Sequence, residues 1–320
     1  MKRFATIFIA GFTLVLAQTR PVSTYSIVAY DEATGQLGVA VQSHWFSVGT
    51  VVPWAKAGVG AVATQSFVRV EYGPDGLALM EQGRTANEAL DSLVAADEGR
   101  DVRQVAMVDV HGHVATYTGS KCIQAAGHQQ GKNFSVQANL MDRPTVWPAM
   151  ARAYEQATGD LADRMLAALN AAQAEGGDIR GRQSAAMLIV TGEPTGIPWK
   201  DVILDLRVDD HPEPLKELAR LLRIHRAYDH ANQGDLYVEK KEIGKALKEY
   251  DLAAKLYPEN PELPYWTAVT LASEGRLAEA LPIFREVFHT NAAWKRLTPR
   301  LVKSDLLPDD PDLLEQILAQ

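Results

Sequence analysis

The feature of this sequence that most limits its fold is the order of its strand-like and helix-like segments. Short runs of β-branched and small residues come first, and a pair of helical segments follows. The same succession is repeated before two last strands. Strands joined by tight turns form antiparallel sheets, and each helix pair needs an apolar face to cover. We therefore predict an α+β fold, a four-layer αββα sandwich of two facing sheets with helices outside each.

The individual segments follow from periodicity and from turn residues. The predicted strands span residues 25–30, 37–41, 58–64, 104–109, 113–118, 134–139, 184–190 and 203–208. The predicted helices span residues 74–82, a segment that starts at Thr85, and residues 146–158 and 161–175. Glu88 lies three residues after Thr85, which is the spacing of a capping box.

Size and charge narrow the class of protein. At 320 residues the chain exceeds one typical domain, and an apolar fraction of 47% is sufficient for a large core. The net charge is -8 and no Lys/Arg-rich run occurs, so a nucleic-acid partner is not expected. Cys122 is the single cysteine, so an intramolecular disulfide is excluded.

The N-terminus has the pattern of a secretory signal, which we assign to residues 1–23. Lys2 and Arg3 precede an apolar run from Phe4 to Ala17 that is short for a membrane span. Cleavage before Gln18 and cleavage before Thr24 both remain open. We expect an exported protein, periplasmic or extracellular, with no stable membrane anchor.

Cleavage before Thr24 would give this residue a free α-amine beside its own hydroxyl. A threonine whose N-terminal amine acts as the base is an established kind of nucleophile. The α-amine has a pKa of about 7.7–8.0, so a fraction of it is neutral at pH 7. The alternative is that Thr24 is an ordinary β-branched residue that opens a strand.

Several segments of residues 24–208 resemble a known family. They are residues 24–29 (TYSIVA), 37–41 (LGVAV) with Ser43, 52–55 (VPWA), 58–65 (GVGAVATQ), 72–74 (YGP) and 176–186 (GGDIRGRQSAA). The domain is identified as a member of the family called domain of unknown function 1028, which belongs to the N-terminal nucleophile hydrolase clan. The resemblance implies the αββα fold and hydrolysis of an amide bond by an N-terminal residue, but it implies no substrate.

Four further polar residues are candidates for catalysis beside Thr24. Ser26 shares a strand face with Thr24 and either orients the amine or is a plain strand serine. Ser43 and Gln65 each follow a predicted strand, and Asn139 ends another, so each either donates a hydrogen bond to an oxyanion or caps backbone groups. Some members of the clan use a lysine on an early strand. Lys56 does not clearly suit that role, so the sequence departs from the pattern there.

The glycine-rich loop before the strand at 184–190 is the candidate substrate-binding segment. It holds four polar side chains, Asp178, Arg180, Arg182 and Gln183. They form either an internal ion-pair network or a fork for a substrate carboxylate. His111 and His113 have no third partner at ligand spacing, so we predict no metal and no cofactor.

Residues 211–320 form a second, helical domain in our interpretation. Ala246 and Ala280, 34 residues apart, begin matching segments, and Tyr250 corresponds to Phe284. This period resembles tetratricopeptide repeats, which bind peptides. The repeats either bind a peptide or protein partner, pack on the first domain, or pair across a homodimer.

Two functions follow. The first is an exported amidase or peptidase that uses an N-terminal threonine on a small amide or peptide substrate. The alternative is a hydrolase-fold binding protein without chemistry, whose helical repeats recruit a partner.

Overall fold

The structure is a computed structural model, and it describes Val22 and residues 24–320. The predicted signal segment therefore lies outside the described residues, apart from Val22. The chain divides into two compact units, with the boundary between Leu215 and Lys216. This boundary falls inside a helix, a few residues after the position 211 expected from the sequence.

The larger sheet of the first unit has six antiparallel strands in the order β10-β9-β2-β1-β8-β7. Its strands are β1 (Thr24–Tyr30), β2 (Leu37–Ser43), β7 (Gly127–Gly131), β8 (Phe134–Ala138), β9 (Ser184–Val190) and β10 (Val202–Val208). The first strand, β1, is central and pairs with β2 and β8, which places Thr24 opposite Ser43. Thr24, which follows one of the two possible cleavage points, thus begins an interior strand.

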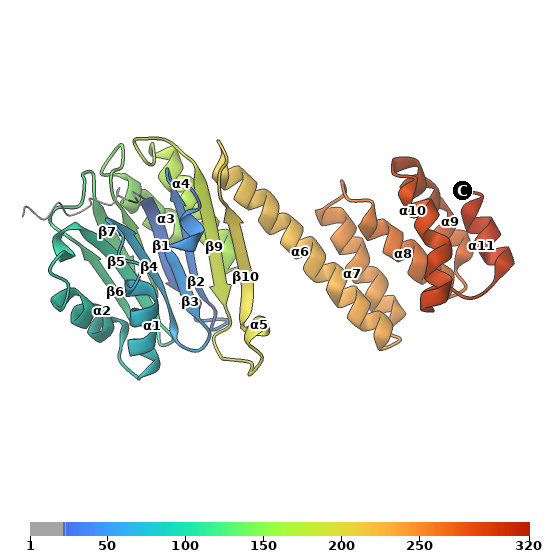
Figure 1. Ribbon diagram of the computed structural model, residues 1–320, viewed down its shortest axis with the longest axis horizontal. Coiled ribbons are helices and arrows are strands. Elements are labelled where there is room, and N and C mark those ends of the chain that lie inside the picture. The colour runs from blue at the N-terminus through green and yellow to red at the C-terminus, as the bar shows by residue number, and fades with distance from the viewer. Residues whose placement is uncertain (1–21, 23) are drawn as a thin grey trace, which may run out of the picture. The chain divides into compact units, whose positions relative to one another are not determined.

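The smaller sheet is also antiparallel, in the order β3-β4-β5-β6. Its strands are β3 (Pro53–Lys56), β4 (Gly60–Ser66), β5 (Arg103–Asp109) and β6 (Val114–Thr118). A buried cluster that includes Val28, Val39, Ala61 and Ala106 joins the inner faces of the two sheets. The sheets thus share one apolar core, and they lie against each other in Figure 1.

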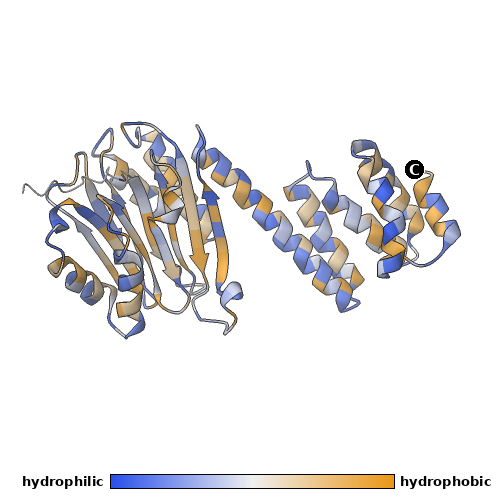
Figure 2. Cartoon of the chain, viewed as in Figure 1, coloured by the Kyte–Doolittle hydropathy of each residue, from blue (hydrophilic) through white to orange (hydrophobic). Residues whose placement is uncertain are grey.

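Two helix pairs cover the outer faces of the sheets. The helices α1 (Tyr72–Glu81) and α2 (Ala86–Ala95) pack on the smaller sheet, while α3 (Val146–Gln156) and α4 (Leu161–Ala174) pack on the larger one. Thr85 and Glu88 form the predicted capping box at the start of α2. Figure 2 shows hydrophilic and hydrophobic residues alternating along the helices, as expected when one face is buried. The mixed α/β composition and the two antiparallel sheets are therefore as predicted.

Two strands were missed in the sequence, and both lie at sheet edges. The strand β3 is four residues long and begins with Pro53, which suits an edge because proline has no N–H to pair. The strand β7 reads Gly-His-Gln-Gln-Gly and has no apolar alternation. The short length of β3 and the lack of apolar alternation in β7, both tolerated at an edge, explain why periodicity does not reveal them. The short elements of this unit are η1 (Val48–Thr50), η2 (Arg100–Val102) and α5 (Pro198–Asp201).

The second unit is helical, as expected. Its elements are α6 (Pro214–Glu239), which crosses the boundary, α7 (Ile243–Leu256), α8 (Glu262–Ser273), α9 (Leu277–Thr290), α10 (Ala293–Leu297), η3 (Thr298–Ser304) and α11 (Pro311–Leu318). Tyr265 and Phe284 lie at the centre of its core, with ring centroids 5.9 Å apart. None of the helices in the described part of the chain combines the length and apolar character needed to cross a bilayer.

Candidate active site

The space between the two sheets is apolar at one end and polar at the end where Thr24 lies. Seven side chains there are fully buried and are called the Thr24 network below. They are Thr24, Ser26, Ser43, Gln65, Gln104, Gln137 and Asn139. Buried polar groups are costly unless they are hydrogen-bonded, so a cluster of this size in a core requires extensive pairing.

Thr24 lies at the start of the network because β1 begins there. Its Oγ1 is 3.1 Å from the Ser43 Oγ across the β1–β2 pair and 2.9 Å from the carbonyl oxygen of Val22. The hydroxyl therefore has two acceptors within reach and no contact with solvent. In this form of the chain, the threonine is covered.

Gln65, from the facing sheet, connects two residues of β1. Its Oε1 accepts a hydrogen bond from the Ser26 hydroxyl at 2.6 Å. Its Nε2 donates to the Gln104 Oε1 at 2.7 Å and to the Thr24 carbonyl at 3.2 Å. Since an amide nitrogen has two hydrogens, these bonds use both. Gln65 thus positions β1 and has no hydrogen left for the predicted oxyanion role.

Asn139 directly follows β8, and its backbone N–H donates to the Thr24 carbonyl at 3.1 Å. Its Nδ2 donates to the Gln104 Oε1 at 2.9 Å. Its Oδ1 is buried and has no hydrogen-bond partner. An unpaired buried acceptor costs about 1–3 kcal/mol of stability. This oxygen is therefore suited to accept a hydrogen bond from a donor that is absent while residues still precede Thr24.

Two members of the network were missed in the sequence, Gln104 and Gln137. The Gln104 amide accepts from both Gln65 and Asn139, and it donates to the Thr118 hydroxyl at 2.9 Å. The Gln137 Nε2 donates to the Ser26 Oγ at 2.5 Å. Both residues lie in predicted strands beside apolar neighbours, Gln104 before Val105 and Gln137 between Val136 and Ala138. A glutamine next to apolar residues of a strand was the signal that would have identified them.

Val22 is described together with Thr24 and is fully buried in the inter-sheet cluster. It forms an antiparallel bridge with Ser66, the last residue of β4. Ser66 has a φ of 73°, in the left-handed region that residues other than glycine seldom adopt. Backbone strain of this kind clusters at functional sites.

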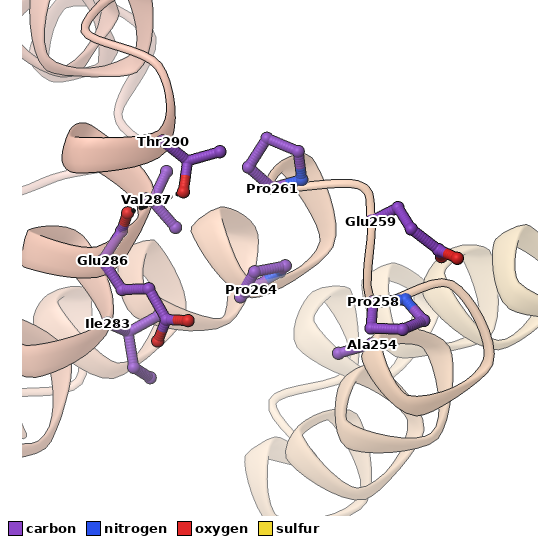
Figure 3. Close-up of a pocket in the computed structure, with 9 residues that line it drawn as sticks. All are labelled: Ala254, Pro258, Glu259, Pro261, Pro264, Ile283, Glu286, Val287 and Thr290. Carbon is purple, nitrogen blue, oxygen red and sulfur yellow. Dashed lines mark hydrogen bonds between the residues drawn. The ribbon is translucent and has the colours of Figure 1, made fainter.

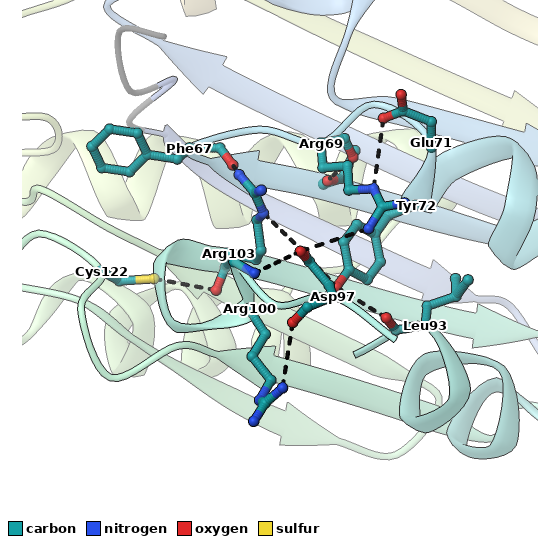
Figure 4. A network of polar contacts seen from close by, with 11 residues as sticks. Phe67, Arg69, Glu71, Tyr72, Leu93, Asp97, Arg100, Arg103 and Cys122 are labelled. Atoms are coloured by element: carbon teal, nitrogen blue, oxygen red, sulfur yellow. Dashed lines mark hydrogen bonds and ion pairs between the residues drawn. The ribbon is translucent and has the colours of Figure 1, made fainter. Parts of the chain in front are cut away.

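A charged cluster holds the segment that follows Ser66 (Figure 4). Arg103, opposite Ser66 in the β4–β5 register, donates to the Phe67 carbonyl and, through Nε, to the Asp97 Oδ2 at 3.0 Å. The Tyr72 hydroxyl also donates to Asp97, at 3.1 Å. Burial raises the pKa of Asp97, but hydrogen bonds from Arg103 and from the Gly99 backbone outweigh it, and the pKa is lowered. The carboxylate is thereby kept charged.

Cys122 borders the same cluster, and its thiol donates to the Arg103 carbonyl at 3.2 Å. Burial raises the pKa of this thiol above its usual range. A thiol with a raised pKa is a poor nucleophile. The structure therefore assigns Cys122 a packing position.

The predicted substrate-binding loop forms internal contacts. The Arg180 guanidinium donates two hydrogen bonds to the Asp178 carboxylate, of 3.0 Å and 2.7 Å. Arg182 lies 3.7 Å from Glu213, and the Gln183 amide donates to Asp210 at 3.1 Å. Of the two alternatives for this loop, the contacts match the internal network. The loop still borders the site, because the backbone N–H of Gln183 donates to the Ser43 carbonyl.

Tyr25 and Lys56 lie away from the network. Tyr25 points to the helix side of the sheet, where its hydroxyl donates to Gln173. Burial is the larger cause that raises the pKa of Tyr25, and the negative charge of Asp178 adds to it. Lys56 pairs with Glu81 on the surface, at 2.5 Å. All seven side chains of the Thr24 network are neutral. Any base for Thr24 must then come from elsewhere, and its own α-amine is one source.

These features define a protein of two facing antiparallel sheets that enclose a buried, neutral polar site at the start of the central strand. The chain belongs to the family of unknown function DUF1028, whose match covers residues 24–218. The match begins at Thr24. A crystal structure of a protein from Silicibacter pomeroyi, assigned to the same family, is similar with a TM-score of 0.56 and 29% identity. The similarity covers 63% of this chain and 88% of that one. The comparison with curated proteins found no match.

Proposed function

We propose that the first unit is an amide hydrolase whose nucleophile is Thr24, exposed as an N-terminal residue when the preceding segment is removed. The observation that carries the proposal is the position of Thr24. It begins the central strand β1, and its hydroxyl lies beside that of Ser43 within a buried polar network. Two facing antiparallel sheets with outer helix pairs are the arrangement expected of the N-terminal nucleophile hydrolase clan, which supports the same reading.

The reaction follows from the groups present. The neutral α-amine of Thr24 takes the hydroxyl proton while Oγ1 bonds to the amide carbon of the substrate. The amine then gives this proton to the leaving nitrogen as the C–N bond breaks, which leaves an ester on Thr24. Water adds to the ester, the amine again carries the proton, and a carboxylic acid is released.

Other members of the network hold these groups in place. The Asn139 Oδ1 has no partner while residues still precede Thr24, and it is suited to accept a hydrogen bond from the newly formed amine. Gln65 and the Asn139 backbone hold the Thr24 carbonyl from two sides. Ser43 lies within reach of the nucleophilic oxygen and can relay its proton. Preorganised groups of this kind lower the barrier because they need no rearrangement during reaction.

The test compares two forms of the chain, one that starts at Gln18 and one that starts at Thr24, against a panel of peptides and simple amides. Hydrolysis is expected in the Thr24 form alone. T24A should lower its rate at least about a thousandfold, as loss of a nucleophile does. T50A, at an exposed threonine, is the matched control and should retain the rate. Equal hydrolysis by T24A would refute the proposal.

Export belongs to the same proposal, since it is the expected route to the new N-terminus. The intact mass of the protein recovered outside the cytoplasm, from a host with a secretory pathway, measures where the chain begins. A start at Thr24 supports the proposal. A start at Gln18 that persists leaves the amine blocked and removes the base.

A second candidate function is binding of a partner by the helical unit, and a hollow there favours it. This hollow has a volume of about 540 Å³ and lies between α6, α8 and the loop after η3. Its lining carries Trp266 and four carboxylates, those of Asp235, Glu239, Glu274 and Asp305. The helix contacts expected of tetratricopeptide units support this reading, since Gly234 fits against the ring of Tyr250.

A smaller hollow of about 210 Å³ lies between the Pro258–Pro264 turn and α9 (Figure 3). Ile283 and Val287 face three prolines across it.

One comparison distinguishes the hydrolase function from the binding function. If the Thr24 form hydrolyses no amide but the full chain retains a peptide partner that W266A loses, the binding function is favoured.

A further inference from the structure

The position of Val22 describes what a substrate of the Thr24 site would look like. Its N–H donates to the Ser66 carbonyl at 2.6 Å, and its carbonyl accepts from the Ser66 N–H at 3.0 Å. Both backbone groups of Val22 are thus paired with the end of β4. Its side chain is completely buried among the residues that join the two sheets.

The same carbonyl oxygen of Val22 also lies 2.9 Å from the Thr24 Oγ1. The Thr24 hydroxyl donates to this oxygen, and the Ser66 N–H donates to it as well. Oxyanion donors lie roughly 2.7–3.1 Å from the oxygen they stabilise, a range that includes the 3.0 Å from the Ser66 nitrogen. A carbonyl group is therefore held within hydrogen-bond reach of both the nucleophile and a backbone donor. Val22 would leave the protein with the preceding segment and open this place.

The geometry points to a substrate whose acyl-side residue replaces Val22, and this inference rests on the proposed function. The substrate is a peptide or an N-acylated amino-acid amide with a small, branched aliphatic side chain. Its N–H donates to the Ser66 carbonyl, its side chain fills the space of Val22, and its scissile carbonyl accepts from the Ser66 N–H. Val22, two residues ahead of Thr24, thus occupies the place of a substrate in the unprocessed chain.

This assigns the oxyanion donor to the backbone of Ser66 in place of the Gln65 side chain. When Thr24 Oγ1 bonds to the carbonyl carbon, the negative charge on oxygen is held by this N–H until the C–N bond breaks. The left-handed φ of Ser66 and the Arg103 contact to the next carbonyl hold the N–H at this point. A backbone donor at a strand end costs no side-chain ordering during the reaction.

The experiment uses the full chain that starts at Thr24 and a series of N-acetyl amino-acid p-nitroanilides. Valine is expected to be preferred over glycine by about 10- to 100-fold in kcat/KM, the gain from burying its side chain. Phenylalanine is expected to fall below valine because the space is of valine size. An analogue of the valine substrate with an ester oxygen in place of its N–H should lose about tenfold, because the Ser66 carbonyl is left unpaired.

T50A, at an exposed threonine outside the site, is the matched control, and its rate should stay within about threefold. A binding experiment titrates T24A, in the form that starts at residue 24, with acetyl-valine amide and with the ester analogue.

If anilides are cleaved in a Thr24-dependent way without preference for valine or for the N–H, the inference fails and the proposed function stands. If none is cleaved but T24A binds the valine amide better than its ester analogue, the proposed function fails and the recognition stands. If neither cleavage nor binding occurs, both are overturned.

Discussion

Ser66 lies directly opposite Arg103 in the pairing of β4 with β5, so the strained end of one strand is held by a charged residue of the next. Arg103 is fixed by Asp97 at 3.0 Å and holds the carbonyl that follows Ser66. The site therefore depends on a charged pair outside the neutral network.

The first prediction concerns Asp97. Its pKa is lowered in the folded protein, so its contribution to stability is present above about pH 4, the unfolded pKa, and is lost as pH falls through the folded pKa. D97N should cost about 3 kcal/mol at pH 7, because Arg103 loses its partner, and the difference from wild type should shrink in acid. Urea unfolding measured from pH 7 down to pH 2 checks this. D101N, at an exposed pair with Lys121, should change stability by less than about 1 kcal/mol at any pH.

The second prediction concerns Gln104, the centre of the Thr24 network. Q104L removes the acceptor of two buried amides, those of Gln65 and Asn139, and should cost about 3 kcal/mol of unfolding free energy. Q130L makes the same change at an exposed position of β7 and should have little effect. Equal losses in the two variants, measured by denaturant unfolding, would mean that the network contributes no stability.

The third prediction concerns the start of α2. The Thr85 side chain accepts from the Glu88 N–H, so T85A should lower stability by about 1 kcal/mol. Thr145 also precedes a helix but forms no cap bond with it, so T145A is the matched control. A smaller loss in T85A than in T145A, followed by thermal unfolding, would contradict the assignment of the cap.

The fourth prediction concerns two glycines of the helical unit. A Cβ at Gly234 would lie 2.5 Å from the ring of Tyr250, so G234A should destabilise the unit although alanine favours helices. A Cβ at Gly244 would have nothing within 4 Å, so G244A should stabilise α7 by up to about 1 kcal/mol. Circular dichroism of the full chain during heating measures both. If G234A raised thermal stability as much as G244A, α6 and α7 would not approach each other as described.

The sequence alone was sufficient for features that depend on neighbouring residues. Turns, the capping box and the alternation of β1 are local, so the antiparallel sheets and the helix pairs followed from spacing. Thr24 and Ser26 also share a face by alternation, and both contact the inner side. The edge strand β3 was missed because it is four residues long, and β7 because it has no apolar alternation.

Only the tertiary structure decided which polar residues meet. Gln104 and Gln137 are far from Thr24 along the chain and join it because the sheets face each other, which no local pattern encodes. The same holds for Val22 and Ser66, whose backbone pairing depends on position and hardly on side-chain type. Sequence specified the nucleophile candidate through its place just after the predicted signal. The packing of two sheets specified what surrounds it, because contacts between distant segments form only when the layers close.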